Sequence, residues 1–477
     1  MALTDSQDIE RIVRAVVQTL QQRQGAGAGN GLGGVQSLPQ GVFHRLDDAV
    51  SEAQSGVSYL KSVANRNKVV AAIRAAGVKH AQSLAEQAVA ETKMGRVQDK
   101  VAKNLSQARH TPGVECLSPR ALTGDGGLTL IENAPWGVIA SVTPSTNPAA
   151  TVINNAISMI AAGNAVVFAP HPAARQVSQR AITLLNQAIS EWGGPKTLLT
   201  TVAEPTIETA QQLFKHPGVQ LLTVTGGEAV VHEARKHTDK RLIAAGAGNP
   251  PTVVDETADI PRAAKDIVWG ASFDNNVICV VEKELIVVAS VADQLKSEMA
   301  KHKAVELTKD QARKLQDLVL TNVQADGRGT VSRDWVGRDA TRLAQAIGLQ
   351  VPDDTRLLFV ETGPDHPFAV TELMMPILPV IRADNVEQAI DLAVKLEAGC
   401  RHTASIHTRS IDNMDRMAEK INTSIFVKNG PCLAGLGFGG EGWTSMTIST
   451  PTGEGVTSAA TFVRLRRCVL VDRFHIV

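Results

Sequence analysis

Between residues 136 and 225 the sequence alternates short apolar runs with longer amphipathic stretches, and this alternation restricts the possible folds more than any other feature. The apolar runs predict strands and the longer stretches predict helices. In chain order these elements are 136–142, 165–168, 173–191, 198–202, 206–215 and 219–224. Such an order favours a mostly parallel, doubly wound α/β sheet, in which ligands bind at the carboxyl ends of the strands.

The chain has 477 residues, which is too long for one compact core, so we expect two or three domains. Strand-like runs resume at 284–288 and 356–360 and predict a second α/β unit. We therefore divide the chain into five segments: a helix (1–20), a linker (21–41), a first α/β domain (42–245), a second α/β domain (246–445) and a return to the first domain (446–477).

Two further segments predict strands that lie outside the main alternation, 128–132 and 465–471. The second of them has no obvious partner nearby in the sequence, which predicts pairing with another subunit. Residues 42–109 are rich in alanine, contain few helix breakers and predict helices.

The first 20 residues predict a short amphipathic helix, because apolar residues recur along one face: Ile9, Ile12, Val13, Val16, Val17 and Leu20. Residues 25–34 are mostly glycine and alanine and predict a flexible linker. A tethered helix has no core of its own to cover its apolar stripe, so we interpret it as a docking or targeting tag. The alternative is a helix that packs back on its own protein. Acidic residues near the N-terminus argue against a secretory signal.

Composition excludes several classes of function. Lys+Arg and Asp+Glu both number 48, so no net charge attracts nucleic acid or an anionic membrane. No apolar run approaches the roughly 18 residues that a membrane span requires. The five cysteines are scattered without a CxxC pair, and the 12 histidines include no HExxH motif, so we predict a reducing compartment and no metal site.

Residues 271–283 form a polar, turn-prone segment that carries one cysteine, Cys279, between apolar neighbours. An ionised thiol is a strong nucleophile, and one held beside a carbonyl carbon suits covalent catalysis. An isolated cysteine is more often a small core residue, so this segment alone favours a structural role, and only the other motifs reverse that interpretation.

Two predicted strand ends carry turns suited to a ligand. His171 lies between two prolines after the run 165–168, and Thr225, Gly226 and Gly227 lead from a strand into a helix. A glycine pair at a helix N-terminus is a plausible turn for binding a phosphate, because backbone N–H groups there point outward.

Four stretches resemble motifs of the aldehyde dehydrogenase superfamily, and specifically of its CoA-acylating branch in bacterial microcompartments: 143–148, 244–251, 271–283 and 371–376. The resemblance covers the chain from about Val42 to the end and is strongest to the ethanolamine-utilisation members. It implies a Rossmann-type NAD-binding domain (42–245), a catalytic domain (246–445) and a small β oligomerisation element. It also implies a homo-oligomer, a dimer or a tetramer.

The same resemblance implies roles for individual residues. Cys279 would attack the aldehyde, while the Asn147 side chain and the backbone N–H of Cys279 would bind the oxyanion. Asn147 could instead cap the helix that follows it. Glu372 would hold the nicotinamide ribose, its alternative being a solvated surface residue. The remaining residues expected at the cofactor are Thr143, Pro144, Ser145, His171, Thr225, Gly226, Gly227 and Gly246.

Two positions depart from the wider family. Hydrolytic members carry a glutamate that activates water where this chain has Ala245. Without that base water competes poorly for an acyl-enzyme, whereas the thiolate of coenzyme A needs no such help. The expected reaction is therefore acetaldehyde + NAD⁺ + CoA to acetyl-CoA + NADH + H⁺. Ala169 stands where many relatives have a lysine for the adenosine ribose, so NAD rather than NADP is inferred from the subfamily.

Three alternatives remain open at this point. Propionaldehyde is the nearest alternative substrate. A cysteine hydrolase would require a histidine base, for which the sequence offers His171, His402 and His407 without a signature. A non-catalytic scaffold would rest on the tag alone. For the enzyme we expect the bacterial cytoplasm, in the lumen of a microcompartment whose shell protein binds residues 1–20.

Overall fold

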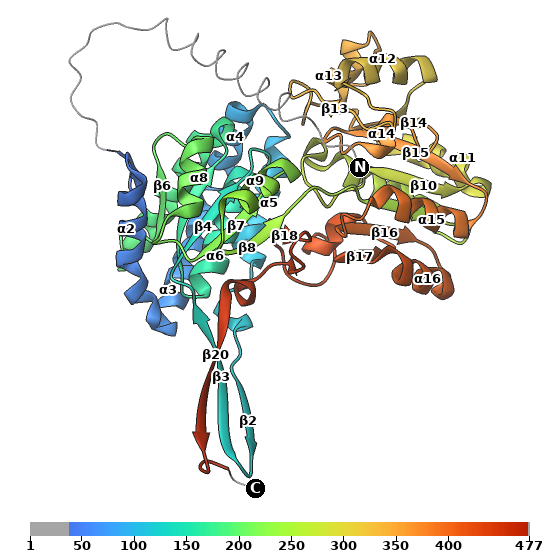
Figure 1. Cartoon of the computed structure of the whole chain (residues 1–477). Helices are drawn as coiled ribbons and strands as arrows, with labels where there is room; N and C mark the ends of the chain where they lie inside the picture. Colours follow the sequence, from blue (N-terminus) through green and yellow to red (C-terminus); the bar gives the residue numbers. More distant parts are fainter. Residues whose placement is uncertain (1–37, 476–477) are drawn as a thin grey trace, which may run out of the picture. The chain divides into compact units, whose positions relative to one another are not determined.

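The first sheet of the computed structural model contains six parallel strands in the order β1-β6-β5-β4-β7-β8 (Figure 1). The structure describes residues 38–475, so the predicted helix 1–20 and most of the linker lie outside the described residues. The strands are β1 (Val42–Phe43), β4 (Val138–Thr143), β5 (Ala165–Pro170), β6 (Leu199–Val202), β7 (Leu221–Thr225) and β8 (Arg241–Ala245). The parallel α/β arrangement predicted from the alternation is thus confirmed.

Eight helices follow or separate these strands: α2 (Leu46–Gly56), α3 (Val63–Lys79), α4 (Ala81–Thr92), α5 (Val97–His110), α6 (Pro148–Ala161), α7 (Arg175–Glu191), α8 (Ile207–Lys215) and α9 (Glu228–His237). The stretch 42–109 is helical as expected except at its start, where β1 pairs with β6. Two residues are too few to produce a strand signal in the sequence.

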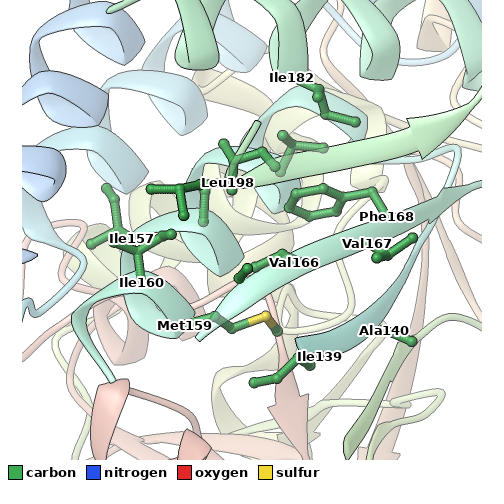
Figure 2. Packing of buried hydrophobic residues seen from close by; sticks show 14 of the residues in the cluster. Ile139, Ala140, Ile157, Met159, Ile160, Val166, Val167, Phe168, Ile182 and Leu198 are labelled. Carbon is green, nitrogen blue, oxygen red and sulfur yellow. The ribbon is translucent and has the colours of Figure 1, made fainter. Parts of the chain in front are cut away.

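Helix α6 lies at the centre of the first core, and all of its residues are buried. Its sequence is apolar on nearly every face, as a fully buried helix requires. In Figure 2, Ile157, Met159 and Ile160 from this helix pack near Ile139 of β4 and Val166 of β5. The short loop that follows α6 leads directly into β5, so the helix also sets the position at which β5 begins.

The order of the strands switches direction between β4 and β7. From β4 the chain proceeds to β5 and β6 on one side, and it later returns to add β7 and β8 on the other. In doubly wound sheets this switch in direction marks the ligand-binding edge, because the loops after the two central strands diverge there.

The second sheet has seven parallel strands in the order β11-β14-β15-β10-β9-β16-β17. They are β9 (Pro251–Val254), β10 (Glu284–Val288), β11 (Ala304–Glu306), β14 (Leu357–Glu361), β15 (Ile377–Ala383), β16 (Thr403–His407) and β17 (Ile425–Lys428). Its main helices are α10 (Ile260–Ser272), α11 (Ala289–Lys301), α12 (Lys309–Val319), α15 (Val386–Glu397) and α16 (Ile411–Ile421). The use of the two sheets as separate cofactor and catalytic domains stays a prediction.

A third, antiparallel sheet joins β2 (Arg120–Gly124), β3 (Gly127–Pro135) and β20 (Val463–Val471). The C-terminal strand thus has a partner within its own chain, and its additional pairing with another subunit stays a prediction. Its partner, β3, lies more than 300 positions earlier in the sequence, so no local pattern could reveal the pairing. Most of β20 is exposed, and a role of this sheet in oligomerisation stays a prediction.

The C-terminal segment returns to the first core before it forms β20. Phe462 is buried against the first sheet, and its carbonyl accepts a hydrogen bond from Asn164 Nδ2 at 2.9 Å. Asn164 is fully buried, and its Oδ1 accepts from the N–H groups of Trp136 (2.7 Å) and Gly137 (3.0 Å). One amide therefore connects the start of β4, the end of α6 and the returning chain.

Replacing Asn164 by alanine is expected to lower the free energy of unfolding by about 2–4 kcal/mol, since buried donors and an acceptor lose their partners. The matched control is Asn133→Ala, which removes one 3.4 Å hydrogen bond to the Ser118 carbonyl. The urea midpoints of both variants measure the effect. Equal midpoints would show that the Asn164 network does not stabilise the fold.

Candidate active site

Four segments of the chain meet at one edge of the second sheet, and each carries a candidate residue of the site. Cys279 precedes β10, Gly248 precedes β9, Glu372 precedes β15 and His402 precedes β16. These four strands are parallel neighbours in the order β15-β10-β9-β16, so the segments before them lie at the same, amino-terminal edge. The sequence predicts a ligand edge at carboxyl strand ends for the first sheet only, whereas these four segments lie at amino-terminal strand ends of the second.

The loop before Cys279 has an unusual backbone. Asp274, Asn275 and Asn276, which end the 3₁₀ turn η4 (Phe273–Asn276), have φ angles of 49°, 53° and 67°. Such left-handed conformations are costly for residues with a Cβ, and aspartate and asparagine tolerate them best. Three left-handed residues in succession reverse the chain sharply and leave the following residues, including Cys279, in a fixed position.

The side chains of the same three residues anchor the loop. The Arg96 N–H donates to Asp274 Oδ1 at 2.7 Å. Asn275 Nδ2 donates to the Gly337 carbonyl at 2.9 Å, and Asn276 Nδ2 donates to the Ala271 and Glu282 carbonyls at 2.8 and 3.0 Å. These hydrogen bonds compensate for backbone strain, which persists only where the surroundings fix it.

Cys279 is partly exposed, whereas its neighbours Ile278 and Val280 are buried in a hydrophobic cluster. Burial of its thiol and the nearby Glu372 carboxylate raise the pKa of Cys279 to about 12, against the opposing charges of Lys283 and Lys103. At neutral pH the resting thiol is therefore protonated, so attack on a carbonyl requires loss of its proton.

Lys283 stabilises the loop that carries Cys279 through hydrogen bonds. Its Nζ donates to the carbonyls of Asn276 (3.1 Å) and Ile278 (3.4 Å) and to Asn276 Oδ1. Burial lowers the pKa of Lys283, while the Glu372 carboxylate acts in the opposite direction. Burial raises the pKa of Glu372, and the Lys283 charge and the Gly248 backbone N–H oppose this rise. Glu372 is thus partly buried beside the cysteine and is not the freely solvated residue of the alternative interpretation.

Gly248 leaves no room for a side chain. A Cβ at this position would lie 2.8 Å from His402 Cγ and 2.9 Å from the Cys279 carbonyl oxygen. His402 is buried, and its Nδ1 lies 2.8 Å from Thr403 Oγ1. Burial lowers the pKa of His402 to about 4, so its ring is neutral at pH 7. The glycine therefore lets His402 and the cysteine loop approach each other.

Asn147 precedes α6 directly, but its side chain makes no capping hydrogen bond to the helix. Its Oδ1 instead accepts from Lys103 Nζ, and its Nδ2 donates to Thr146 Oγ1 at 3.2 Å. Lys103 Nζ also lies 3.4 Å from the Val277 carbonyl. The structure thus brings Asn147 near the cysteine loop with an amide that is not used as a helix cap.

Apart from Glu372, the residues predicted to bind the cofactor lie at the carboxyl edge of the first sheet, in the segments that follow its strands. Thr143 ends β4, its carbonyl accepts from the His171 N–H at 3.0 Å, and its buried hydroxyl has no partner. Pro144 and Ser145 follow in the bend that leads to α6.

At the end of the neighbouring strand β7 lies Thr225, whose hydroxyl is 2.8 Å from Thr447 Oγ1. Gly226 N–H donates to the Ala245 carbonyl at 3.3 Å, and a side chain on the exposed Gly227 would meet no atom within 4 Å. Gly246 follows β8, where a Cβ would lie 2.9 Å from Pro451. The open N-terminus of α9 at Gly227 fits a phosphate.

Reasoning from the sequence missed Lys103 and Gly248 as residues of this site, and it missed that Lys100 is buried. Lys103 and Lys100 lie in a stretch that predicts only helices, and a lysine on a helix is normally solvated. Their spacing of three positions places them on one face, but nothing local indicates that this face is buried.

Among residues 38–475 no group of three or more His, Cys, Asp or Glu side chains is arranged to hold a metal ion. Within the same residues, no helix is long and apolar enough to cross a membrane.

Comparison with known proteins identifies close relatives. The model of the aldehyde dehydrogenase family matches residues 35–446. The chain is 69% identical over 473 residues to the acetaldehyde dehydrogenase (acetylating) EutE of Escherichia coli (strain K12), covering 99% of this chain and 100% of that protein.

Two solved structures are similar over nearly their whole length. One is a Rhodopseudomonas palustris propionaldehyde dehydrogenase with bound CoA and an acylated cysteine (TM-score 0.88, 45% identity, 91% of this chain and 99% of that chain). The other is a propionaldehyde dehydrogenase from the Clostridium phytofermentans fucose utilisation bacterial microcompartment (TM-score 0.89, 43% identity, 92% of this chain and 100% of that chain).

Replacing Glu372 by glutamine is expected to lower the pKa of Cys279, because it removes a negative charge that disfavours the thiolate. At pH 7.5 the rate of Cys279 alkylation by iodoacetamide should rise about 3- to 10-fold. Glu361→Gln is the control, since Glu361 pairs with Arg382 and Lys296. An unchanged rate for Glu372→Gln would contradict the electrostatic coupling.

Proposed function

The chain belongs to the aldehyde dehydrogenase family, and we propose that it converts acetaldehyde, NAD⁺ and coenzyme A into acetyl-CoA, NADH and a proton. The identity of 69% to an acetylating acetaldehyde dehydrogenase supports this proposal. The observation that carries the acyl-transfer half of the reaction is Ala245, an apolar side chain where hydrolytic relatives have a catalytic base.

In this mechanism Cys279 is the nucleophile. Its thiol first loses the proton that the overall reaction releases, and the thiolate then attacks the aldehyde carbon. The resulting thiohemiacetal oxygen carries the developing negative charge. The Asn147 amide donates a hydrogen bond to that oxygen, together with the backbone N–H of Cys279. NAD⁺, when bound, accepts the hydride whose loss converts the thiohemiacetal into a thioester.

Two features of the site fit the nicotinamide cofactor. The open backbone at Gly226 and Gly227 suits a pyrophosphate at the N-terminus of α9. The buried Thr143 hydroxyl has no partner of its own at the switch point of the sheet. Glu372 lies beside Cys279, where the predicted contact with the nicotinamide ribose would orient the reactive end of the cofactor.

The thioester is then transferred to coenzyme A rather than to water. Ala245 is only 4% exposed and ends β8, so no carboxylate at this position can activate water. A thiolate is a strong nucleophile without a general base. His402 is neutral, and its Nδ1 is hydrogen-bonded to the Thr403 hydroxyl. Within the described residues no hydrogen bond joins His402 to Cys279. The absence of such a histidine base disfavours a cysteine hydrolase.

The predicted outcome is NADH formation that depends on coenzyme A. With acetaldehyde and NAD⁺ alone, about one NADH per active site should form; addition of coenzyme A should start multiple turnovers. Cys279→Ala should abolish both phases, while Cys468→Ala, which changes an exposed cysteine, should retain them. Absorbance at 340 nm measures NADH in both phases. Sustained turnover without coenzyme A would overturn the acylating mechanism.

Propionaldehyde is a second candidate substrate, because two similar structures are propionaldehyde dehydrogenases. The same assay distinguishes the two aldehydes through the ratio of their kcat/KM values. One methylene in an apolar pocket changes this ratio by roughly 10- to 200-fold.

We also propose that the enzyme works in the lumen of a bacterial microcompartment as a homo-oligomer, with residues 1–20 bound to a shell protein. One similar structure comes from a microcompartment enzyme, and the amphipathic sequence of residues 1–20 suits docking. The largely exposed strand β20 offers a surface through which copies of the chain could associate.

A fusion of residues 1–20 to a fluorescent protein is expected to sediment with microcompartment shells. The matched control replaces Ile9, Val13 and Val16 by glutamate, which interrupts the apolar stripe with three charges and keeps the length. Diffuse fluorescence from the unmodified fusion would contradict the targeting role.

A further inference from the structure

Two buried lysines of α5 converge on one carboxylate of the cysteine loop. Lys100 Nζ lies 2.9 Å from Asp274 Oδ2, and Lys103 Nζ contacts the same oxygen. The side chains of Lys100, Lys103 and Asp274 are 4%, 1% and 0% exposed. Removing two ammonium groups from water is costly, and a single carboxylate does not neutralise both. Stability of the fold therefore does not explain why two buried lysines share one carboxylate at this position.

The two lysines differ in their second acceptor. Lys100 donates to the Thr146 backbone carbonyl at 2.8 Å. Lys103 donates to the side-chain oxygen of Asn147 and lies 3.4 Å from the Val277 carbonyl. Within the described residues, Lys103 alone joins the Asn147 amide to the loop that carries Cys279. Both lysines and Asn147 line a small cavity of about 10 Å³, which is about the space of one water molecule.

An ammonium group dictates which way the Asn147 amide faces. It carries three donors and no acceptor, so it accommodates the amide oxygen and repels the amide NH₂. Burial lowers the pKa of Lys103 to about 8, against the opposing effect of Asp274, and the group is still charged at neutral pH. With Oδ1 held by Lys103, Nδ2 points away; one of its two N–H groups meets Thr146 Oγ1, and the other is left to donate to a substrate.

We propose that Lys103, held by Asp274, is a positioning residue that orients the Asn147 amide so that its N–H faces the oxyanion formed at Cys279. The inference rests on the oxyanion role of Asn147 in the proposed function. It goes further because it assigns the orientation of that amide to a buried ion pair that also fixes the cysteine loop.

A double-mutant cycle tests this role, with Lys100→Met as the matched control for Lys103→Met. Each substitution removes one lysine and leaves Asp274 with the other lysine and the Arg96 N–H. Both substitutions are made in the otherwise unchanged full-length enzyme and in the full-length Asn147→Ala variant. The rate of NADH formation from acetaldehyde in one turnover is measured with kcat and KM, and the melting temperature reports folding.

We expect Lys103→Met to lower kcat by about 10- to 100-fold with KM unchanged, and Lys100→Met to lower it by less than about 3-fold. In the Asn147→Ala background Lys103→Met should cause no further loss, because the amide that it orients is gone. An equal loss from Lys103→Met in both backgrounds would overturn the positioning role. A full rate for Asn147→Ala would instead overturn the oxyanion assignment itself, so the two failures are distinguishable.

Lys103→Gln keeps the test valid if Lys103→Met does not fold. A glutamine amide retains polarity beside Asp274 but has both a donor and an acceptor, so it does not select one orientation of Asn147. The same loss and the same non-additivity with Asn147→Ala are expected. A Lys103→Gln enzyme with the parental kcat would overturn the proposal.

Discussion

The active site depends on the placement of one carboxylate, that of Asp274. It accepts hydrogen bonds from two buried lysines of α5 and from the Arg96 backbone, and it belongs to a residue with a left-handed backbone just before the cysteine. The strained loop cannot relax without breaking charged hydrogen bonds in a dry interior, where such a loss is severe. A glycine is also required at position 95, because a Cβ there would lie 2.1 Å from Asp274 Oδ1 and would displace the carboxylate.

This interaction also explains how two sheets form one site. The first sheet presents loops at its carboxyl edge and the second at its amino edge, because β8 continues into β9 through only residues 246–250. Lys103 and Asp274 connect a helix of the first core to a loop of the second. The proposed cofactor edge and the proposed nucleophile thus belong to different sheets, and each sheet keeps its own core.

Much of the fold was predictable because its signals are local. Apolar runs such as 165–168 and the amphipathic stretch 173–191 correspond to β5 and α7 within a few residues. The resemblance of four short motifs led to the aldehyde dehydrogenase family, which the family model and the 69% identity confirm. The pairing of β20 with β3 was not predictable, since its partners are remote in sequence.

The sequence by itself determined the family, the parallel α/β order and the absence of a glutamate at Ala245, since these features are properties of residues and their neighbours along the chain. Only the tertiary structure decided which polar groups surround Cys279. Lys103 and Asp274 are ordinary surface types in the sequence, and their importance arises from burial and from contacts between segments 171 positions apart. A charge acquires such influence only where water is excluded, and water exclusion is a property of the folded chain.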